Sequence, residues 1–271
     1  MDLWEGRLIK VTEQKYPSSF LNEVARAKER ILLTDYDGVL APFSRDRRGA
    51  FPFPGICDLL LGMMQCRTRL VVISGRPAHE VASFLAMQTA PEIWGNDGLE
   101  RLYPDGRYEC EDLNAPIDLL RALAECESEL EQKGLKSLIE VKLTAVTVHW
   151  RGLTPSEKLE TRTTAYRVLQ PLTLLYPRLR VVAMEEGFEL RLPVPSKADA
   201  VRRLLNLTPS NAPIAYLGHG VEDEDLFRTL NGRGLTVLVR PVQRFTAAQI
   251  RLRPPDELVR FLKDWISACD S

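Results

Sequence analysis

Two carboxylates separated by one residue, Asp35 and Asp37, come directly after the apolar run Ile31–Thr34. An apolar run of this length indicates a buried strand, and open α/β sheets bind their ligands beyond the carboxyl ends of such strands. At that place Asp35 can attack phosphorus as a nucleophile, while Asp37 can protonate the leaving oxygen and then deprotonate a hydrolytic water. Gly38 permits the sharp turn that follows. The alternative is a common Asp-x-Asp-Gly turn whose carboxylates only accept hydrogen bonds from backbone amides.

A second apolar run, Leu70–Ile73, ends in a Ser-Gly-Arg tripeptide. A hydroxyl with adjacent amides can hold a phosphoryl oxygen at a helix N-terminus, so Ser74 is a candidate catalytic residue and Arg76 a candidate substrate-binding residue. Lys197 begins a later helix, where its ammonium can neutralise charge on Asp35 and on a transferring phosphoryl group. The alternatives are an ordinary turn and a solvated lysine.

A third apolar run, Ile214–Leu217, precedes a segment that reads Gly-His-Gly-Val-Glu-Asp-Glu-Asp over residues 218–225. Four acids therefore fall in the first turn of the helix that we expect there. The helix dipole alone favours acids at this place, so their number does not by itself indicate a site.

The elements that must position these residues follow one pattern, in which short apolar strands alternate with helices. This alternation is typical of an α/β fold with a doubly wound parallel sheet. Strands are expected at 31–34, 70–73, 93–94, 214–217 and 235–239. Helices are expected at 18–30, 56–66, 77–85, 196–207, 222–230 and 256–267.

The pattern changes in the middle of the chain. A helix at 116–133 precedes an alternating strand that runs from Ile139 to Trp150, a helix follows Thr154, and short strands are expected at 180–184 and 188–192. This arrangement indicates an α+β module with one solvated sheet face. We therefore expect a core of residues 1–113 and 193–271 and an inserted α+β cap domain of residues 114–192, with proline-containing hinges between them.

The composition excludes several classes of protein. The 271 residues carry 36 Lys and Arg against 37 Asp and Glu, so the net charge of −1 gives no general attraction to nucleic acid. The sequence shows no secretory signal and no run of about 18 apolar residues, so we expect a cytoplasmic protein that does not bind membranes. The five cysteines are scattered and never spaced as C-x-x-C, which indicates ordinary thiols. The sequence gives no role to residues 1–17.

Taken in order, these motifs resemble the four-loop signature of the haloacid dehalogenase superfamily. From about residue 30 onward the chain resembles the trehalose-6-phosphate phosphatase family. The matching segments are Asp35-Tyr36-Asp37-Gly38-Val39-Leu40-Ala41-Pro42, Val72-Ile73-Ser74-Gly75-Arg76, Gly95-Asn96-Asp97-Gly98-Leu99-Glu100, Leu217-Gly218 and Glu222-Asp223-Glu224-Asp225-Leu226-Phe227. The resemblance implies a haloacid-dehalogenase core with a cap, an aspartyl-phosphate intermediate, a magnesium ion, and a phosphorylated sugar, trehalose 6-phosphate, as the substrate.

The cap segment adds to the resemblance through Glu140, Lys142 and His149-Trp150-Arg151. The resemblance implies that Glu140 and Lys142 hydrogen-bond sugar hydroxyls, while His149 and Arg151 lie near the polar end of the substrate. Glu140 and Lys142 share one strand face by the period of two, and a sugar needs both acceptors and donors. His149 has the opposite parity, so a bend or bulge must lie between them. A lone histidine is otherwise more often structural.

The fourth motif departs from the family pattern Gly-Asp-Asp-x-Thr-Asp-Glu-Asp, because His219 and Gly220 replace two aspartates. By the resemblance, the first of these completes a magnesium site with Asp35 and the backbone carbonyl of Asp37. Magnesium prefers oxygen ligands, so an imidazole at position 219 shifts the preference toward manganese, iron or zinc. Acids in the next helical turn can restore an oxygen ligand. The candidate metal ligands are therefore Asp35, Asp37, His219, Glu222 and Asp223.

Two functions from different classes remain at this point. The first is a sugar-phosphate phosphatase, acting on trehalose 6-phosphate or on another phosphorylated sugar. The second is a catalytically impaired relative that binds a sugar phosphate as a regulatory or partner subunit. The retained Asp35, Asp37, Ser74 and Lys197 favour the enzyme, because a binding module has no physical need for a nucleophile together with an acid/base group. Association with a glycosyltransferase partner is left open.

Overall fold

The computed structural model describes residues 9–10, 16–43 and 49–270, so most of residues 1–17 lie outside its description. The chain divides into a core unit, Met1–Cys110 with Pro195–Ser271, and an inserted unit, Glu111–Val194. These boundaries fall close to those expected at residues 113 and 193. Within the described ranges, no helix is both long and apolar enough to cross a membrane.

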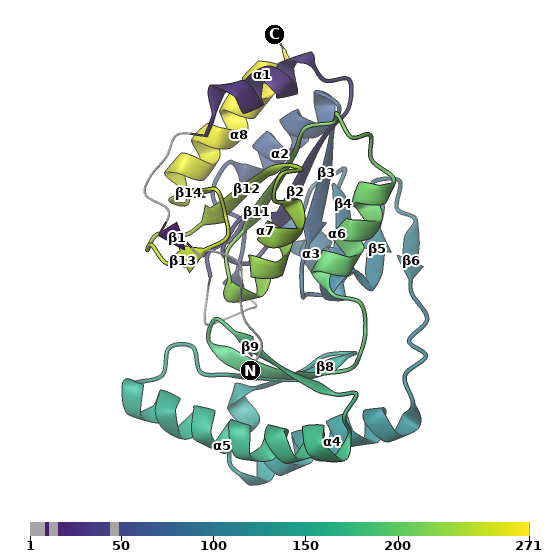
Figure 1. The fold of residues 1–271 in the computed structure, drawn as a ribbon, viewed down its shortest axis with the longest axis vertical. Helices are drawn as coiled ribbons and strands as arrows, with labels where there is room; N and C mark the ends of the chain where they lie inside the picture. The colour runs from purple at the N-terminus through teal and green to yellow at the C-terminus, as the bar shows by residue number, and fades with distance from the viewer. Residues whose placement is uncertain (1–8, 11–15, 44–48, 271) are drawn as a thin grey trace. The chain divides into compact units, whose positions relative to one another are not determined.

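The core unit contains an eight-stranded sheet in the order β14-β12-β11-β2-β3-β4-β5-β6 (Figure 1). Pairing is parallel from β14 to β4 and antiparallel at β4–β5 and β5–β6. The strands are β2 (Arg30–Asp35), β3 (Thr68–Ile73), β4 (Glu92–Gly95), β5 (Glu100–Leu102), β6 (Tyr108–Cys110), β11 (Ile214–Gly218), β12 (Leu235–Val239) and β14 (Ile250–Leu252). A further short pair joins β1 (Ile9–Lys10) to β13 (Phe245–Thr246). The expected doubly wound sheet is confirmed, whereas its antiparallel edge was not predicted.

Helices cover both faces of this sheet because its strands are apolar on both sides. Leu32 of β2 belongs to the core cluster that includes α1 (Ser18–Arg26), α2 (Ile56–Gln65), α3 (Ala78–Leu85) and α8 (Asp256–Cys269). Ile31 and Leu33 belong to the opposite cluster, with α6 (Lys197–Asn206) and α7 (Glu224–Leu230). The strand order reverses at β2, since β3 and β11 lie on its two sides. A ligand site is expected beyond the carboxyl end of such a strand.

The inserted unit is a four-stranded antiparallel sheet in the order β7-β8-β10-β9 with two helices. Its elements are α4 (Ile117–Gln132), β7 (Ile139–Val141), β8 (Ala145–His149), α5 (Pro155–Leu175), β9 (Arg180–Met184) and β10 (Gly187–Arg191). The apolar side chains of one sheet face form a core with α4 and α5.

The single strand expected from Ile139 to Trp150 is wrong. The chain turns after β7, where the Lys142 N–H donates to the Ala145 carbonyl oxygen at 2.8 Å, and β8 runs back beside β7. The turn contains no glycine or proline, so the alternation of polar and apolar residues continues across it and hides it in the sequence.

Candidate active site

Strand β2 delivers Asp35 to the carboxyl edge of the core sheet. The strand is buried along its length, and Asp35 is its last residue. Asp35 pairs with Ile73 of β3, so Ser74 follows at the same edge. Beyond β2 the chain folds back tightly, and the Ala41 N–H donates to the Tyr36 carbonyl oxygen at 3.1 Å. The two predicted loops therefore begin side by side.

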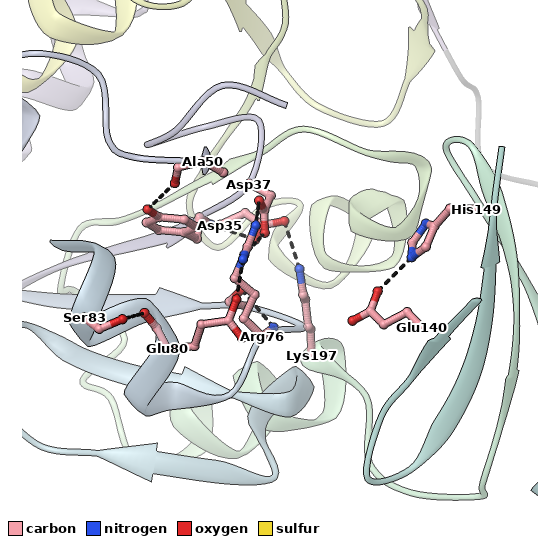
Figure 2. Close-up of polar contacts among 11 residues, drawn as sticks. Asp35, Asp37, Ala50, Arg76, Glu80, Ser83, Glu140, His149 and Lys197 are labelled. Carbon is pink, nitrogen blue, oxygen red and sulfur yellow. Dashed lines mark hydrogen bonds and ion pairs between the residues drawn. The ribbon is translucent and has the colours of Figure 1, made fainter. Parts of the chain in front are cut away.

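Lys197 lies against the candidate nucleophile. Its Nζ donates to Asp35 Oδ2 at 2.9 Å and lies 3.6 Å from Asp223 Oδ1 (Figure 2 shows the Asp35 contact). Lys197 is the first residue of α6, and a capping box between Ser196 and Asp199 closes that end of the helix. The capping box thus defines where α6, and with it Lys197, begins.

Negative charge is in excess around Asp35. Burial raises the pKa of the Asp35 carboxyl well above its usual range, with Lys197 opposing this shift and Asp223 adding to it. Burial lowers the pKa of the Lys197 ammonium, but nearby carboxylates outweigh burial and hold this pKa well above its ordinary value. These carboxylates belong to Asp35, Asp223 and Asp97. Lys197 therefore stays charged at neutral pH, and any further cation at this site favours the nucleophilic, ionised form of Asp35.

Asp223 holds the fourth loop together. Its Oδ2 accepts the N–H groups of His219 at 2.7 Å and Gly220 at 3.0 Å, and its Oδ1 accepts the Tyr216 hydroxyl at 2.6 Å. Although burial alone raises the pKa of the Asp223 carboxyl, Lys197 and these donors lower it below its ordinary value. Asp223 is thus an ionised carboxylate whose oxygens already accept several hydrogen bonds. The part played by Tyr216 was not predicted from its place in the apolar run.

The other two candidate metal ligands of the fourth loop, His219 and Glu222, have different neighbours. The buried His219 ring lies 4.8 Å from the Phe43 ring, centroid to centroid, and its Nδ1 is 2.9 Å from the Val239 carbonyl oxygen. The carboxylate of Glu222 lies over Gly220, where an added Cβ would be 2.2 Å from Glu222 Cδ. Across residues 9–10, 16–43 and 49–270, no three His, Cys, Asp or Glu side chains are grouped to hold a metal ion.

The donors around Asp35 nevertheless suit a divalent cation. The Asp35 carboxylate accepts hydrogen bonds from the Tyr36 N–H at 2.7 Å and from Lys197, and a carboxylate offers about four acceptor positions. Magnesium is commonly held by one or two carboxylates together with water and substrate phosphate, rather than by a full protein cage. The donor set and the excess negative charge therefore suit a weakly ligated cation.

Arg76, expected to bind substrate, has two carboxylates as partners. The guanidinium is buried and makes two 2.7 Å hydrogen bonds to Asp37, and it also pairs with Glu80 (Figure 2). The Arg76 N–H donates to Ser74 Oγ at 3.1 Å, which fixes the Ser74 hydroxyl at the start of the loop. Glu80 was not predicted as a partner, because Arg76 lies in the loop before α3, outside the helix in which residues four apart regularly pair.

The inserted unit has a polar cluster of its own on one face of its sheet. The hairpin brings His149 Nε2 to 2.7 Å from Glu140 Oε2, so the required bend is a complete chain reversal (Figure 2). Lys142 Nζ donates to Glu189 Oε2 at 2.7 Å. Arg151 lies in the turn that follows β8.

Glu189 is a member of this cluster that the sequence did not reveal. It lies on β10 between the core residues Phe188 and Leu190, it is buried, and it also accepts the Thr147 hydroxyl at 3.0 Å. The only sign in the sequence was that Glu189 is an acid between two apolar residues of an expected strand. Carboxylates, an ammonium, a hydroxyl and an imidazole on one face can bind a polyhydroxylated ligand.

The sequence is similar to those of known proteins of one family. The family model for trehalose-phosphatase matches residues 33–256. Probable trehalose-phosphate phosphatase 9 of Oryza sativa subsp. japonica is 27% identical, over 94% of this chain and 75% of that protein. Probable trehalose-phosphate phosphatase J of Arabidopsis thaliana is 28% identical, over 89% of this chain and 68% of that protein.

Solved structures agree on the fold. The C-terminal domain of the C. albicans trehalose-6-phosphate phosphatase matches with a TM-score of 0.79 at 19% identity, covering 96% of this chain and 99% of that one. An Aspergillus fumigatus trehalose-6-phosphate phosphatase matches with a TM-score of 0.67 at 20% identity, over 96% and 99% of the two chains. The C-terminal domain of a Candida albicans trehalose synthase regulatory protein matches at 0.65 and 15%, over 95% and 99%.

Proposed function

The chain belongs to the trehalose-phosphatase family and is a phosphoric monoester hydrolase that acts on a sugar phosphate, and we propose that its substrate is trehalose 6-phosphate. The observation that carries the proposal is the pairing of Asp35 with Lys197 at 2.9 Å, at the end of a buried strand in a chain of this family. The alternative of a non-catalytic sugar-phosphate-binding subunit is not favoured, because the family model and the relatives from Oryza sativa and Arabidopsis thaliana carry the name of a phosphatase.

The mechanism we propose has two displacements. Asp35 Oδ attacks phosphorus and the bond to the sugar oxygen breaks, while Asp37 gives a proton to that oxygen. Asp37 then takes a proton from water, which attacks the aspartyl-phosphate and releases inorganic phosphate. Lys197 neutralises charge on the phosphoryl oxygens, and Ser74 with its neighbouring amides holds one of them.

Phosphatases of this superfamily generally depend on a divalent metal. The residues proposed to hold the metal here are Asp35, through its carboxylate, and Asp37, through its backbone carbonyl. When bound, the cation would offset charge on the transferring phosphoryl group. Magnesium is the metal that we expect, and manganese is the alternative because position 219 carries an imidazole in place of a carboxylate.

Sugar recognition is proposed for the inserted unit. Glu140 and His149 form one polar pair, and Lys142 joins Glu189 in another. These groups offer the acceptors and donors that sugar hydroxyls need. We also propose association with a glycosyltransferase, since the chain matches 29% of the length of alpha,alpha-trehalose-phosphate synthase [UDP-forming] B of Dictyostelium discoideum at 24% identity, over 84% of this chain.

The test is phosphate release from a panel of sugar phosphates, measured with magnesium and with manganese, beside the Asp35→Asn variant. We expect turnover of trehalose 6-phosphate that the variant loses by at least about 10³-fold, because the amide cannot form the covalent intermediate. Binding of a sugar phosphate without turnover of any panel member in either metal would favour the non-catalytic alternative.

A further inference from the structure

We propose that Arg76, anchored by Glu80, is a positioning residue that fixes the Asp37 carboxylate for its proton transfers. This inference rests on the proposed phosphatase function. In this proposal Arg76 binds the Asp37 carboxylate of the protein itself and not the substrate. Glu80 then supports the reaction by holding Arg76.

The contact between Arg76 and Asp37 is bidentate. Arg76 Nε donates to Asp37 Oδ2 and Arg76 Nη2 donates to Asp37 Oδ1, both at 2.7 Å. Two parallel bonds between planar groups fix the plane of the carboxylate as well as its distance. The remaining nitrogen, Nη1, donates to Glu80 Oε1 on helix α3. The guanidinium therefore ties Asp37 to the first turn of α3.

The surroundings hold Arg76 in this orientation. Its guanidinium carbon lies 5.7 Å from the centre of the Tyr36 ring and 5.0 Å from the centre of the Phe84 ring. The Tyr36 hydroxyl donates in turn to the Ala50 carbonyl oxygen at 2.7 Å, as Figure 2 shows. The Arg76 side chain is 1% exposed, so it cannot turn toward a phosphate without leaving two carboxylates.

Asp37 itself remains within reach of a substrate, because its side chain is 27% exposed. In the first step a proton passes from Asp37 to the sugar oxygen as the bond from that oxygen to phosphorus breaks. In the second step water gives a proton back to Asp37 as it attacks the aspartyl-phosphate. Such transfers contribute roughly 10²–10⁴-fold to rate and require the carboxylate to be aligned with the leaving oxygen.

The test compares two leaving groups in a single turnover with excess enzyme. One substrate is trehalose 6-phosphate, or the sugar phosphate that the wild type hydrolyses best, whose leaving alkoxide needs a proton. The other is p-nitrophenyl phosphate, whose leaving group departs without one. The variants are Arg76→Lys, which has a point charge in place of the planar fork, and Glu80→Ala, which removes the anchor.

The matched control is Arg69→Lys. Arg69 makes a similar two-point contact with Glu92, at 2.9 and 3.1 Å, from the neighbouring strand β3, and its side chain is 47% exposed. Far-UV circular dichroism and thermal unfolding verify the fold of each variant. Glu80 is 39% exposed on its side chain, so Glu80→Ala carries the test if Arg76→Lys does not fold.

We expect Arg76→Lys to lower the hydrolysis rate of the sugar phosphate by roughly tenfold or more, and that of p-nitrophenyl phosphate by less than about threefold. Glu80→Ala should show the same selectivity to a smaller degree. Arg69→Lys should change neither rate. Equal losses with both substrates, or a rise in KM alone, would overturn the inference while leaving the phosphatase function intact. An inactive wild type would overturn both.

Discussion

Replacing Tyr216 with phenylalanine should cost the core unit about 1.5–3 kcal/mol of folding free energy. The Tyr216 hydroxyl is buried and donates to Asp223 at 2.6 Å, and a hydrogen bond to a charged group is worth about that much. Burial, Asp223 and Asp35 raise the pKa of the Tyr216 hydroxyl well above its ordinary value, so it remains a donor at neutral pH. The matched control is Tyr103→Phe, whose hydroxyl donates to Glu109 at 2.8 Å in an exposed contact. That variant should stay within about 0.5 kcal/mol of the wild type.

The pH dependence of this loss has a definite sign. The pKa of Asp223 is lowered in the folded chain, so its interactions contribute stability above the ordinary pKa of an aspartate and lose it as pH falls through the folded value. The difference between the wild type and Tyr216→Phe should thus be constant from about pH 5.5 to 8 and should shrink below about pH 4. Urea unfolding of both proteins, from the acid region to about pH 8, measures this difference in the free energy of unfolding. A loss no larger than that of Tyr103→Phe, or one that does not shrink in acid, would refute the reasoning.

Three further perturbations have expected outcomes. His219→Asp should lower the magnesium concentration for half-maximal phosphatase activity by about tenfold or more by adding an oxygen ligand, and an unchanged metal titration would contradict the assignment. Gly38→Ala should destabilise the fold by at least about 2 kcal/mol in urea unfolding, because φ is +78° and the new Cβ would lie 2.3 Å from His219 Cγ; wild-type stability would contradict this. Lys142→Met should destabilise the inserted unit by about 3 kcal/mol, because it leaves the Glu189 charge buried without the ammonium of Lys142. Adding Glu189→Met should recover most of this stability. Hydrogen exchange of residues 111–194 measures both changes, and an unaltered exchange in Lys142→Met would contradict the prediction.

Much of the core fold follows from local pattern. β2 is predictable because a charged pair interrupts a short apolar run, and the parallel arrangement then brings Ser74 to the same edge. Lys197 is predictable as the start of a helix, but its contact with Asp35 spans 162 residues and depends on tertiary packing.

The parts that were missed depend on partners distant in sequence or on turns without turn residues. The β7–β8 hairpin has no local signal, and Glu189 acquires meaning only when Lys142 lies beside it. Arg76 was predicted to bind substrate, and only the fold places Asp37 and Glu80 around it. The departure at His219 is visible in the sequence, whereas the orientation of its ring toward Val239 is not.

The capping box at Ser196 and Asp199 has a consequence for how this architecture can diversify. The inserted unit ends at Val194, and the capping box closes the start of α6 within the next five residues. The cap of the helix that carries Lys197 therefore uses no side chain of the preceding 84-residue segment, residues 111–194. Evolution or design can therefore exchange that segment, for which we propose sugar recognition, while the capped start of α6 and its lysine are kept.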